Sequence, residues 1–574
     1  TMRKRMQGIV GIVVLVAALL GAPPGALGAE LWSDVADTSW LNQHAGTESD
    51  PYLIETAEQL AGLSKLVNAG NAFRDKHILL TRDISVAGRE WIPVGWMCAY
   101  GDLADFAGTL DGGGHAVTGV TISTGEHLPV SPNCFKICHS GAFLGYVAPV
   151  ATVKNLVLMG AITNKYSNGA AGLTTWSDGN ILNCITSFDL MGASPNNAYV
   201  AGVASLNGGG LIRNCVAYGS IKTHGAGGAN YAGGILGFSH WYNGSLQNCV
   251  AMCSEITADM DAGGIVGGFS PNQSEFRYCT SAADKVKANP SYTGGIVGAY
   301  GYGWIDCYWL KVNENQPSFG LGTGKVPGGM ITDPAKLPVT AVVLDTVDVR
   351  TMLVGETREV HARHYPPTGD PSGVKYKWSV KGTGLSVLSG MDGPVLKVKA
   401  VSEGYHALSL SVTGVLGVPA ASDDAALTPG AVLKVVNALP PATGIALGGP
   451  GHALKEGEVA TLTAAIVPAD AKPEGLTWTV AKAEGQGAVD DLLLEDHGDG
   501  TATVTLKKQY KDGASYGVTV QSAGGLSATT TVWGEALGAE PNVPGFVPIG
   551  AMLPGGAEGK RPFGVTSDQA AELM

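Results

Sequence analysis

The strongest pattern of apolar and polar positions is a short glycine-rich phrase that recurs between Gly141 and Gly298. Each phrase sets one apolar residue among small residues, as in Gly-Gly-Ile265-Val-Gly. These apolar residues are Phe143, Leu173, Val203, Ile235, Ile265 and Ile296. They follow one another at spacings of 30, 30, 32, 30 and 31 residues. A period of this size predicts a solenoid, in which each repeat buries its apolar face against its neighbours.

A second repeated pair follows the first and places a cysteine at a constant position in the later repeats. The pairs are Asn183-Cys184, Asn214-Cys215, Asn248-Cys249, Tyr278-Cys279 and Asp306-Cys307. The register of these five cysteines comes from the repeat and not from a disulfide framework. We therefore expect them to stack inside the solenoid as small buried hydrophobes.

A single amphipathic helix is predicted over about residues 57–68, ahead of the repeats. Thr56 and Gln59 form a capping-box pattern, and Leu60, Leu63 and Val67 fall on one helical face. An open solenoid end would recruit other strands. The helix is therefore expected to cap the first coil of a domain spanning residues 30–335.

Two segments of similar pattern follow a linker at 333–338, at residues 339–438 and 441–535. Each contains alternating apolar and polar strands and one central tryptophan, Trp378 or Trp478. Such alternation predicts two immunoglobulin-like β-sandwiches. The fold class is therefore all-β, and residues 536–574 are expected to form a flexible tail rich in Pro and Gly.

The N-terminal pattern predicts an exported protein. Residues 1–29 read as a signal peptide, with a basic head, an apolar stretch and small residues near Ala29; a retained anchor is the alternative. Removing three positive charges takes the net charge from −13 to −16. An acidic chain without a basic run argues against nucleic acid and, after signal cleavage, against a membrane. The expected location is secreted or the bacterial cell surface.

The remaining cysteines leave disulfide pairing open. Cys134 and Cys138 lie in an expected insertion at 123–140 and could form a local disulfide. Cys249 with Cys253, or Cys98 with a loop partner, are further candidates in an oxidising compartment. The total of 9 cysteines is odd, so at least one thiol stays unpaired within the chain or pairs with another molecule.

The phrase Asp50-Pro51-Tyr52-Leu53-Ile54, then Phe106-Ala-Gly-Thr-Leu-Asp111-Gly and the Gly-Gly-Ile-Val-Gly…Asn-Cys repeats, resembles bacterial surface proteins with GLUG motifs. That family includes the N-terminal region of immunoglobulin-A-cleaving proteases, and the resemblance implies a right-handed parallel β-helix. Residues 339–535 resemble group 2 bacterial immunoglobulin-like domains. Both resemblances imply an exported surface protein or stalk, and neither implies a reaction.

No catalytic or metal-binding constellation emerges from the sequence. The closest approach to a His-Glu-x-x-His zinc motif is His361-Ala-Arg-His364, which lacks the glutamate. The repeats show no column of Asp, Lys or Arg at a constant offset. We therefore expect no enzyme activity, no metal and no cofactor. Parallel β-helices also carry polysaccharide lyases and hydrolases, so such an enzyme is the alternative.

Aromatic residues recur three or four positions after the central apolar residue. They are Tyr146, Trp176, Phe238, Phe269 and Tyr300, with Leu206 in the remaining repeat and Trp241 in an adjoining turn. Stacked coils would align these rings on one edge, where exposed rings could bind a glycan or a host or extracellular protein. A buried stack that fills the corner is the alternative. The sequence thus favours an adhesin-like binding protein, with a purely structural stalk as a further possibility.

Overall fold

The computed structural model describes residues 31–536 with internal gaps. The gaps are 99–102, 123–137, 140, 165–168, 194–197, 225–229, 240–243, 270–274, 289–291, 299–303, 318–327, 347–350, 421–425, 449–452, 468–470, 472–474, 486, 499 and 512. The predicted signal peptide and the tail beyond residue 536 lie outside the described residues.

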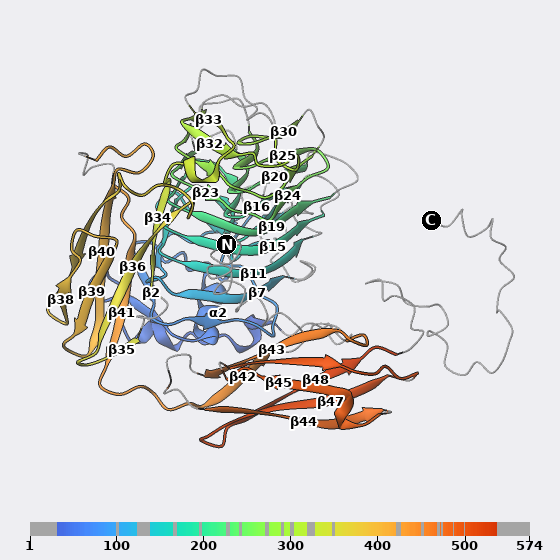
Figure 1. Ribbon diagram of the computed structural model, residues 1–574. Coiled ribbons are helices and arrows are strands. Elements are labelled where there is room, and N and C mark those ends of the chain that lie inside the picture. Colours follow the sequence, from blue (N-terminus) through green and yellow to red (C-terminus); the bar gives the residue numbers. More distant parts are fainter. Residues whose placement is uncertain are drawn as a thin grey trace, which may run out of the picture.

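The predicted repeats form a parallel β-solenoid of about six turns, over residues 77–309. One coil contains β14 (Asn180–Leu182), β15 (Ile185–Gly192), β16 (Ala198–Ala201) and β17 (Ala204–Asn207). Each strand pairs in parallel with its equivalent in the neighbouring coil, as β15 does with β11 (Val157–Asn164) and β19 (Val216–Thr223). The coils climb from blue to green in Figure 1. The solenoid prediction is therefore confirmed.

The equivalent strands build four parallel sheets, named here I to IV. Sheet I contains β1 (Tyr52–Ile54), β2 (His77–Leu80), β6 (Thr109–Asp111), β10 (Thr152–Lys154), β14, β18 (Leu211–Arg213), β22 (Ser245–Gln247), β27 (Glu275–Arg277) and β31 (Trp304–Ile305). Sheet II contains β3 (Ile84–Ser85), β7 (Ala116–Ile122), β11, β15, β19, β23 (Val250–Ala251), β24 (Glu255–Thr257), β28 (Thr280–Ser281), β29 (Val286–Lys287), β32 (Cys307–Leu310) and β33 (Gly328–Ile331). Sheet III contains β12 (Gly169–Ala171), β16, β20 (Asn230–Gly233), β25 (Asp261–Gly263) and β30 (Thr293–Gly294). Sheet IV contains β9 (Leu144–Val147), β13 (Thr174–Ser177), β17, β21 (Leu236–Ser239) and β26 (Val266–Phe269).

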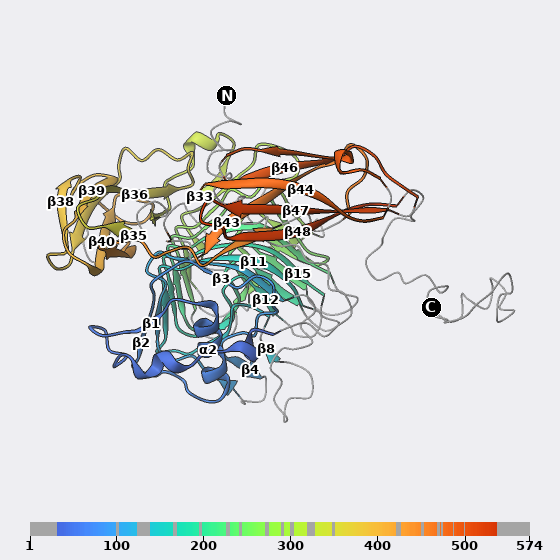
Figure 2. The same ribbon diagram turned by 90° about the horizontal axis from the view of Figure 1, so that it is seen from below.

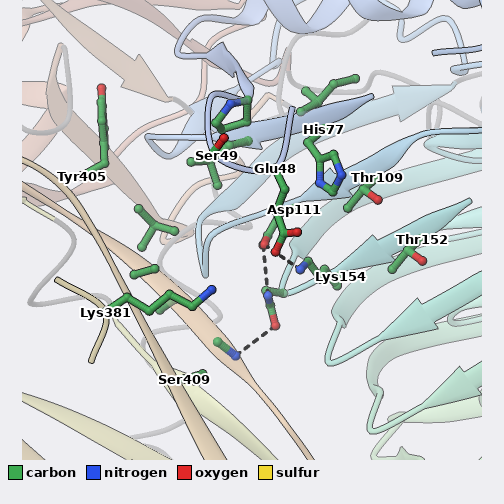
Figure 3. Close-up of a pocket in the computed structure, with 18 of the residues that line it drawn as sticks. Glu48, Ser49, His77, Thr109, Asp111, Thr152, Lys154, Lys381, Tyr405 and Ser409 are labelled. Carbon is green, nitrogen blue, oxygen red and sulfur yellow. Dashed lines mark hydrogen bonds and ion pairs between the residues drawn. The ribbon is translucent and has the colours of Figure 1, made fainter. Parts of the chain in front are cut away.

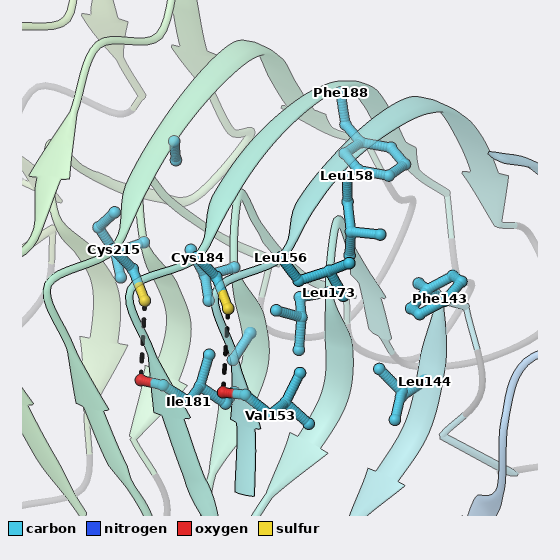
Figure 4. Packing of buried hydrophobic residues seen from close by; sticks show 14 of the residues in the cluster. Phe143, Leu144, Val153, Leu156, Leu158, Leu173, Ile181, Cys184, Phe188 and Cys215 are labelled. Atoms are coloured by element: carbon cyan, nitrogen blue, oxygen red, sulfur yellow. Dashed lines mark hydrogen bonds between the residues drawn. The ribbon is translucent and has the colours of Figure 1, made fainter. Parts of the chain in front are cut away.

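The glycine-rich phrase forms the corner between sheets III and IV. Its central apolar residues, Phe143 to Ile296, are fully buried in the solenoid core. Glycine is needed at this corner because neighbouring coils approach closely: a Cβ on Gly264 would lie 2.2 Å from the carbonyl oxygen of Gly295. Figure 4 shows Leu173 and Phe143 packed with the interior of the adjoining strands.

The Asn-Cys pair forms the corner between sheets I and II, where the chain turns through a left-handed residue. The turning residues have φ between 48° and 57°; they are Asn155, Asn183, Asn214, Asn248, Tyr278 and Asp306. Asparagine and aspartate tolerate this conformation better than most side chains. The cysteine that follows points inward, and Cys184, Cys215, Cys249, Cys279 and Cys307 are fully buried as predicted, without disulfides (Figure 4).

The N-terminal end of the solenoid is covered by the predicted helix, α2 (Ala57–Asn68). The side chain of Thr56 accepts a hydrogen bond from the Gln59 backbone N–H at 3.2 Å, and the Gln59 side chain accepts one from the Glu55 N–H. This capping box fixes the first turn. Leu60, Leu63 and Val67 are fully buried against the core, so the helix prediction is confirmed. The 3₁₀ turns η1 (Trp32–Val35) and η2 (Ser39–Asn42) precede it.

Two antiparallel immunoglobulin-like sandwiches follow the 3₁₀ turn η4 (Pro334–Lys336), as predicted. The first, sandwich 1, contains β34 (Ala341–Asp345), β35 (Thr351–Leu353), β36 (Thr357–Tyr365), β37 (Lys375–Val380), β38 (Leu385–Ser389), β39 (Val395–Ala400), β40 (Gly404–Thr413) and β41 (Gly430–Val436). The second contains β42 (Gly444–Gly448), β43 (Val459–Val467), β44 (Leu476–Gly485), η5 (Val489–Asp491), β45 (Leu492–Asp496), β46 (Thr501–Leu506), β47 (Ala514–Ser522) and β48 (Ser527–Gly534). Trp378 and Trp478 are buried in the two cores.

Sandwich 1 packs along the solenoid and does not act as a detached spacer. The left-handed asparagines of sheets I and II hydrogen-bond its backbone. The Nδ2 atom of Asn214 donates to the Val342 carbonyl at 2.6 Å, and the Val342 N–H donates back to Asn214 Oδ1 at 2.9 Å. The other contacts join Asn248 to the carbonyls of Thr340 and Leu416, Asn183 to that of Thr428, and Asn155 to the Gly430 N–H. Both ribbon views show the sandwich alongside the coils (Figures 1 and 2).

Apolar and ionic contacts extend this interface along most of the solenoid. Val216 and Val250 of sheet II pack against Ala341, Val343 and Tyr365. At the opposite end, the Tyr405 hydroxyl donates to Glu55 Oε1 at 2.8 Å, and Lys434 lies 3.4 Å from the same oxygen. Burial alone would raise the pKa of Glu55, but these partners and Arg82 lower it overall. Sandwich 1 therefore runs back from the last coils to the first.

Three further strands, β4 (Trp96–Cys98), β5 (Leu103–Ala104) and β8 (Cys138–His139), form a small antiparallel sheet beside the first coils. Their register places Cys98 opposite Cys138. The predicted pairing of Cys138 with Cys134 stays a prediction because Cys134 lies outside the described residues. Among the described residues, no helix is long and apolar enough to cross a membrane.

Replacing Asn214 with glycine is expected to loosen sandwich 1 without straining the corner. Glycine accepts the positive φ, so the variant removes only side-chain hydrogen bonds: the two with Val342 of β34, which together contribute about 1–3 kcal/mol, and the one to Asn183. Hydrogen exchange followed by mass spectrometry should show faster exchange of the Val342 amide. Asp306→Gly is the matched control, because among the described residues the Asp306 side chain makes no hydrogen bond to sandwich 1. Unchanged exchange in Asn214→Gly would contradict the role assigned to this side chain.

The stacked cysteines should resist alkylation until the solenoid unfolds. Burial raises the pKa of the Cys184, Cys249 and Cys279 thiols, and burial with the nearby Asp284 charge raises that of Cys253 to about 12. The thiolate is the reactive form, so native protein should not react at these sites with iodoacetamide at pH 8. Peptide mapping before and after addition of denaturant measures this. Rapid labelling of Cys184 or Cys249 in native protein would show that the stack opens.

Candidate binding surfaces

The aromatic residues after the glycine-rich phrase align across sheet IV, with one correction. Trp176 lies between Tyr146 and Leu206 in the strand register, and Leu206 pairs with Phe238. The next coil places Gly268, not Phe269, opposite Phe238. Phe269 is four residues after its central isoleucine, whereas Phe238 is three after its own. The register position opposite Phe238 therefore carries no aromatic side chain, and the predicted column ends at Phe238.

The aligned residues differ in exposure. Tyr146 and Trp176 are buried, at 6% and 9% exposed, and Phe238 is half-buried. Asp178 accepts hydrogen bonds from the Tyr146 hydroxyl at 2.8 Å and from the Trp176 indole N–H at 3.2 Å. These two rings therefore pack within the protein, and their polar atoms are already hydrogen-bonded to Asp178. Trp241 and Tyr300 lie outside the described residues.

Two tyrosines that the sequence pattern did not single out extend the surface from Phe238. Tyr199 of β16 and Tyr231 of β20 face each other in the strand register, with ring centroids 5.6 Å apart and an interplanar angle of 8°. Phe238 lies 5.4 Å from Tyr199 and 4.9 Å from Tyr231. All three are half-buried. We call Tyr199, Tyr231 and Phe238 the aromatic cluster.

A glycine makes room for the aromatic cluster. A Cβ on Gly268 would lie 2.5 Å from ring atoms of Tyr231, so the Tyr231 ring covers the backbone where the predicted column would have continued. The sequence does contain a pattern that indicates the orientation of the two tyrosines. In β16 and β20 they alternate with Val200 and Ala232, which are buried in the core, and this period-two pattern directs both rings outward.

A buried carboxylate follows the tyrosines in sheet III. Asp261 of β25 pairs with Tyr231 in the register and is 3% exposed. Its Oδ1 atom has no hydrogen-bond partner within the described part of the chain. Burial raises the pKa of Asp261 to about 6. Burial and the Asp261 charge in turn raise the pKa of Tyr231 to about 12. The cluster thus carries an unsatisfied acceptor beside its rings.

A second candidate surface is a groove of about 770 Å³ between sheet I and sandwich 1. Figure 3 shows Thr109, Thr152 and Asp111 on the solenoid side and Ser409, Lys381 and Tyr405 on the sandwich side. Pockets of about 300–1,000 Å³ are typical of small-molecule sites, and domain interfaces are common places for them. The sequence did not predict this groove because it exists only where the two domains meet.

The described residues contain no group of three or more His, Cys, Asp or Glu side chains that could hold a metal ion. His361 and His364 lie on β36 opposite Asp345 and Val342 of β34, and burial lowers the pKa of His364. The arrangement in both candidate surfaces is suited to binding through rings, hydroxyls and ion-paired groups.

The geometry defines a β-solenoid protein with two tandem immunoglobulin-like sandwiches. No protein-family model matches this sequence, and comparison with curated proteins gives no match. Among solved structures, similarity extends to the Yersinia pseudotuberculosis adhesin InvE at 15% identity, covering 34% of this chain and 58% of that chain with a TM-score of 0.13. Domains 5-6 of the S-layer protein SbsC match at 13% identity, covering 35% and 98%, with a TM-score of 0.14. A chimeric titin Z1Z2 matches at 17% identity, covering 33% and 92%, with a TM-score of 0.15. Scores this low carry no argument about function.

Replacing Asp261 with asparagine is expected to stabilise the protein near neutral pH. The folded-state pKa of about 6 lies above the ordinary value of 3.8, so the folded state binds more protons between these pH values. Stability therefore falls as the pH rises from about 4 to 6, and stays reduced above 6. Thermal unfolding should show a higher midpoint for Asp261→Asn at pH 7.5 and no such gain at pH 4. Asp189→Asn, on the exposed face of β15, is the control. An equal effect at both pH values would contradict the assignment.

Proposed function

We propose that this chain is a secreted or cell-surface, non-enzymatic, adhesin-like protein that binds a glycan or a host or extracellular protein through its β-solenoid. The aromatic cluster carries the proposal. Its rings come from adjacent coils of a regular scaffold, so the spacing between them is set by the backbone and not by flexible loops. The resemblance to GLUG-motif surface proteins and the signal-peptide pattern of residues 1–29 support an exported location.

A glycan fits the cluster better than a flat protein surface. Half-buried rings present apolar faces and edges that pack against the C–H faces of sugars, and each tyrosine adds a hydroxyl. The nearby carboxylates do not contribute to this fit, because Asp261 is 3% exposed and Asp178 accepts hydrogen bonds from Tyr146 and Trp176. Apolar ring faces with hydroxyls beside them therefore favour a polyhydroxylated ligand.

The full chain should bind immobilised glycans in an array, and loss of the rings should weaken that binding. Tyr199→Ala combined with Tyr231→Ala is expected to reduce affinity by at least about tenfold, equivalent to about 1.4 kcal/mol. Surface plasmon resonance with the best array ligand measures the change. Trp533→Ala, an aromatic residue 53% exposed on β48 of the second sandwich, is the matched control.

The same samples distinguish the alternatives. Unchanged affinity in the double tyrosine variant would move the site away from the cluster. Release of shortened or unsaturated products during incubation with polysaccharides would replace the proposal with a lyase or hydrolase. Binding to no glycan and no extracellular-matrix protein would favour the structural stalk.

A further inference from the structure

The groove between sheet I and sandwich 1 is open where its two walls carry short side chains. Thr109 and Thr152 occupy equivalent positions on neighbouring strands of the solenoid wall. Ala407 and Ser409 occupy alternate positions of β40 on the sandwich wall. Larger side chains, His77 and Lys154 among them, line the groove beside these positions. Packed sheets lie about 10 Å apart when larger side chains fill the space between them, so short side chains at these four positions leave part of that space open.

Contacts at both ends hold the walls apart at a constant separation. At one end, Asn183 Nδ2 donates to the Thr428 carbonyl at 3.0 Å, and the Gly430 N–H donates to Asn155 Oδ1 at 3.1 Å. At the other end, Glu55 joins Tyr405 and Lys434. The groove is therefore formed before a ligand binds and is not a gap between loosely tethered domains. Binding carries no free-energy cost for closing the two domains together.

The charges that line the groove nearly cancel. Lys154 lies 3.3 Å from Asp111, and the His44 ring lies 2.7 Å from Asp50. The exposed rim adds one charge of each sign, Glu48 and Lys381. Figure 3 shows Lys381 extending from the sandwich wall toward the solenoid wall. With histidines counted as neutral, two lysines face three carboxylates, so the lining has a formal charge of −1 and gives an anion no net attraction and a cation only a weak one.

We propose that this groove binds a neutral oligosaccharide chain. An ion pair such as Asp111 with Lys154 presents an acceptor and a donor side by side, which matches a sugar hydroxyl that both donates and accepts. The hydroxyls of Thr109, Thr152 and Ser409 add further partners. The Tyr405 ring, which is 38% exposed, supplies an apolar wall at one end. This site is separate from the aromatic cluster and does not depend on the function proposed for it.

The test uses the full chain and three neutral probes: cello-, malto- and chitooligosaccharides of six residues, measured by isothermal titration calorimetry. At least one probe should bind. Ser409→Trp should weaken that binding by tenfold or more, because Ser409 is exposed and the indole fills the groove without disturbing either core. Thr152→Val keeps the shape but removes one hydroxyl, and should weaken binding by about threefold to tenfold. Ser386→Trp, an exposed serine on the other sheet of the sandwich, should bind as the wild type does.

Three outcomes would overturn the proposal: no binding of any neutral probe, binding that survives Ser409→Trp, or a preference for oligogalacturonate that fades with added salt. Salt sensitivity identifies an ionic ligand because screening weakens exposed charge interactions. The Tyr199→Ala and Tyr231→Ala variant should retain groove binding in full. Failure of the aromatic cluster as a site therefore leaves this test unaffected.

Discussion

The left-handed corner between sheets I and II is the constraint on which the rest of the structure depends. At each such corner one residue with φ near 50° turns the chain from sheet I into sheet II, so that the next side chain points into the core and the turning side chain points out. The inward cysteines keep the interior narrow and regular. The outward asparagines bond to one another, as Asn214 does to Asn183 at 2.8 Å, and also to the backbone of sandwich 1. One local conformation therefore determines both the packing of the coils and the attachment of the next domain.

Local patterns in the sequence predicted local structure well. The thirty-residue period located the coils, and Thr56 with Gln59 located the start of α2. The prediction of one continuous aromatic column was wrong at Phe269. Phe269 follows its central isoleucine by four residues and Phe238 follows its own by three, so the two occupy different register positions. The tyrosines of the aromatic cluster belong to a different sheet from the predicted column. The repeat pattern behind that column therefore does not include them.

The attachment of sandwich 1 could not be predicted, although its residues were visible. From the sequence, the Asn-Cys pairs predict only that the cysteines are buried. Their second role depends on Thr340, Val342 and Thr428, which lie far away in the chain and carry no matching repeat. Contacts between a periodic surface and a nonperiodic one leave no periodic signal. The groove shares this origin, because its two walls come from separate domains.

The backward course of sandwich 1 has a mechanical consequence. The chain leaves the solenoid after its last coils, yet β41 ends beside Glu55 at the first coil, where Lys434 is anchored (Figure 1). Tension applied through the second sandwich would therefore enter the molecule at the capped end of the solenoid. It would load many asparagine contacts in parallel, as shear along the interface, before it could peel away a terminal coil. In a protein held between two surfaces, this geometry would protect the repeats from unzipping.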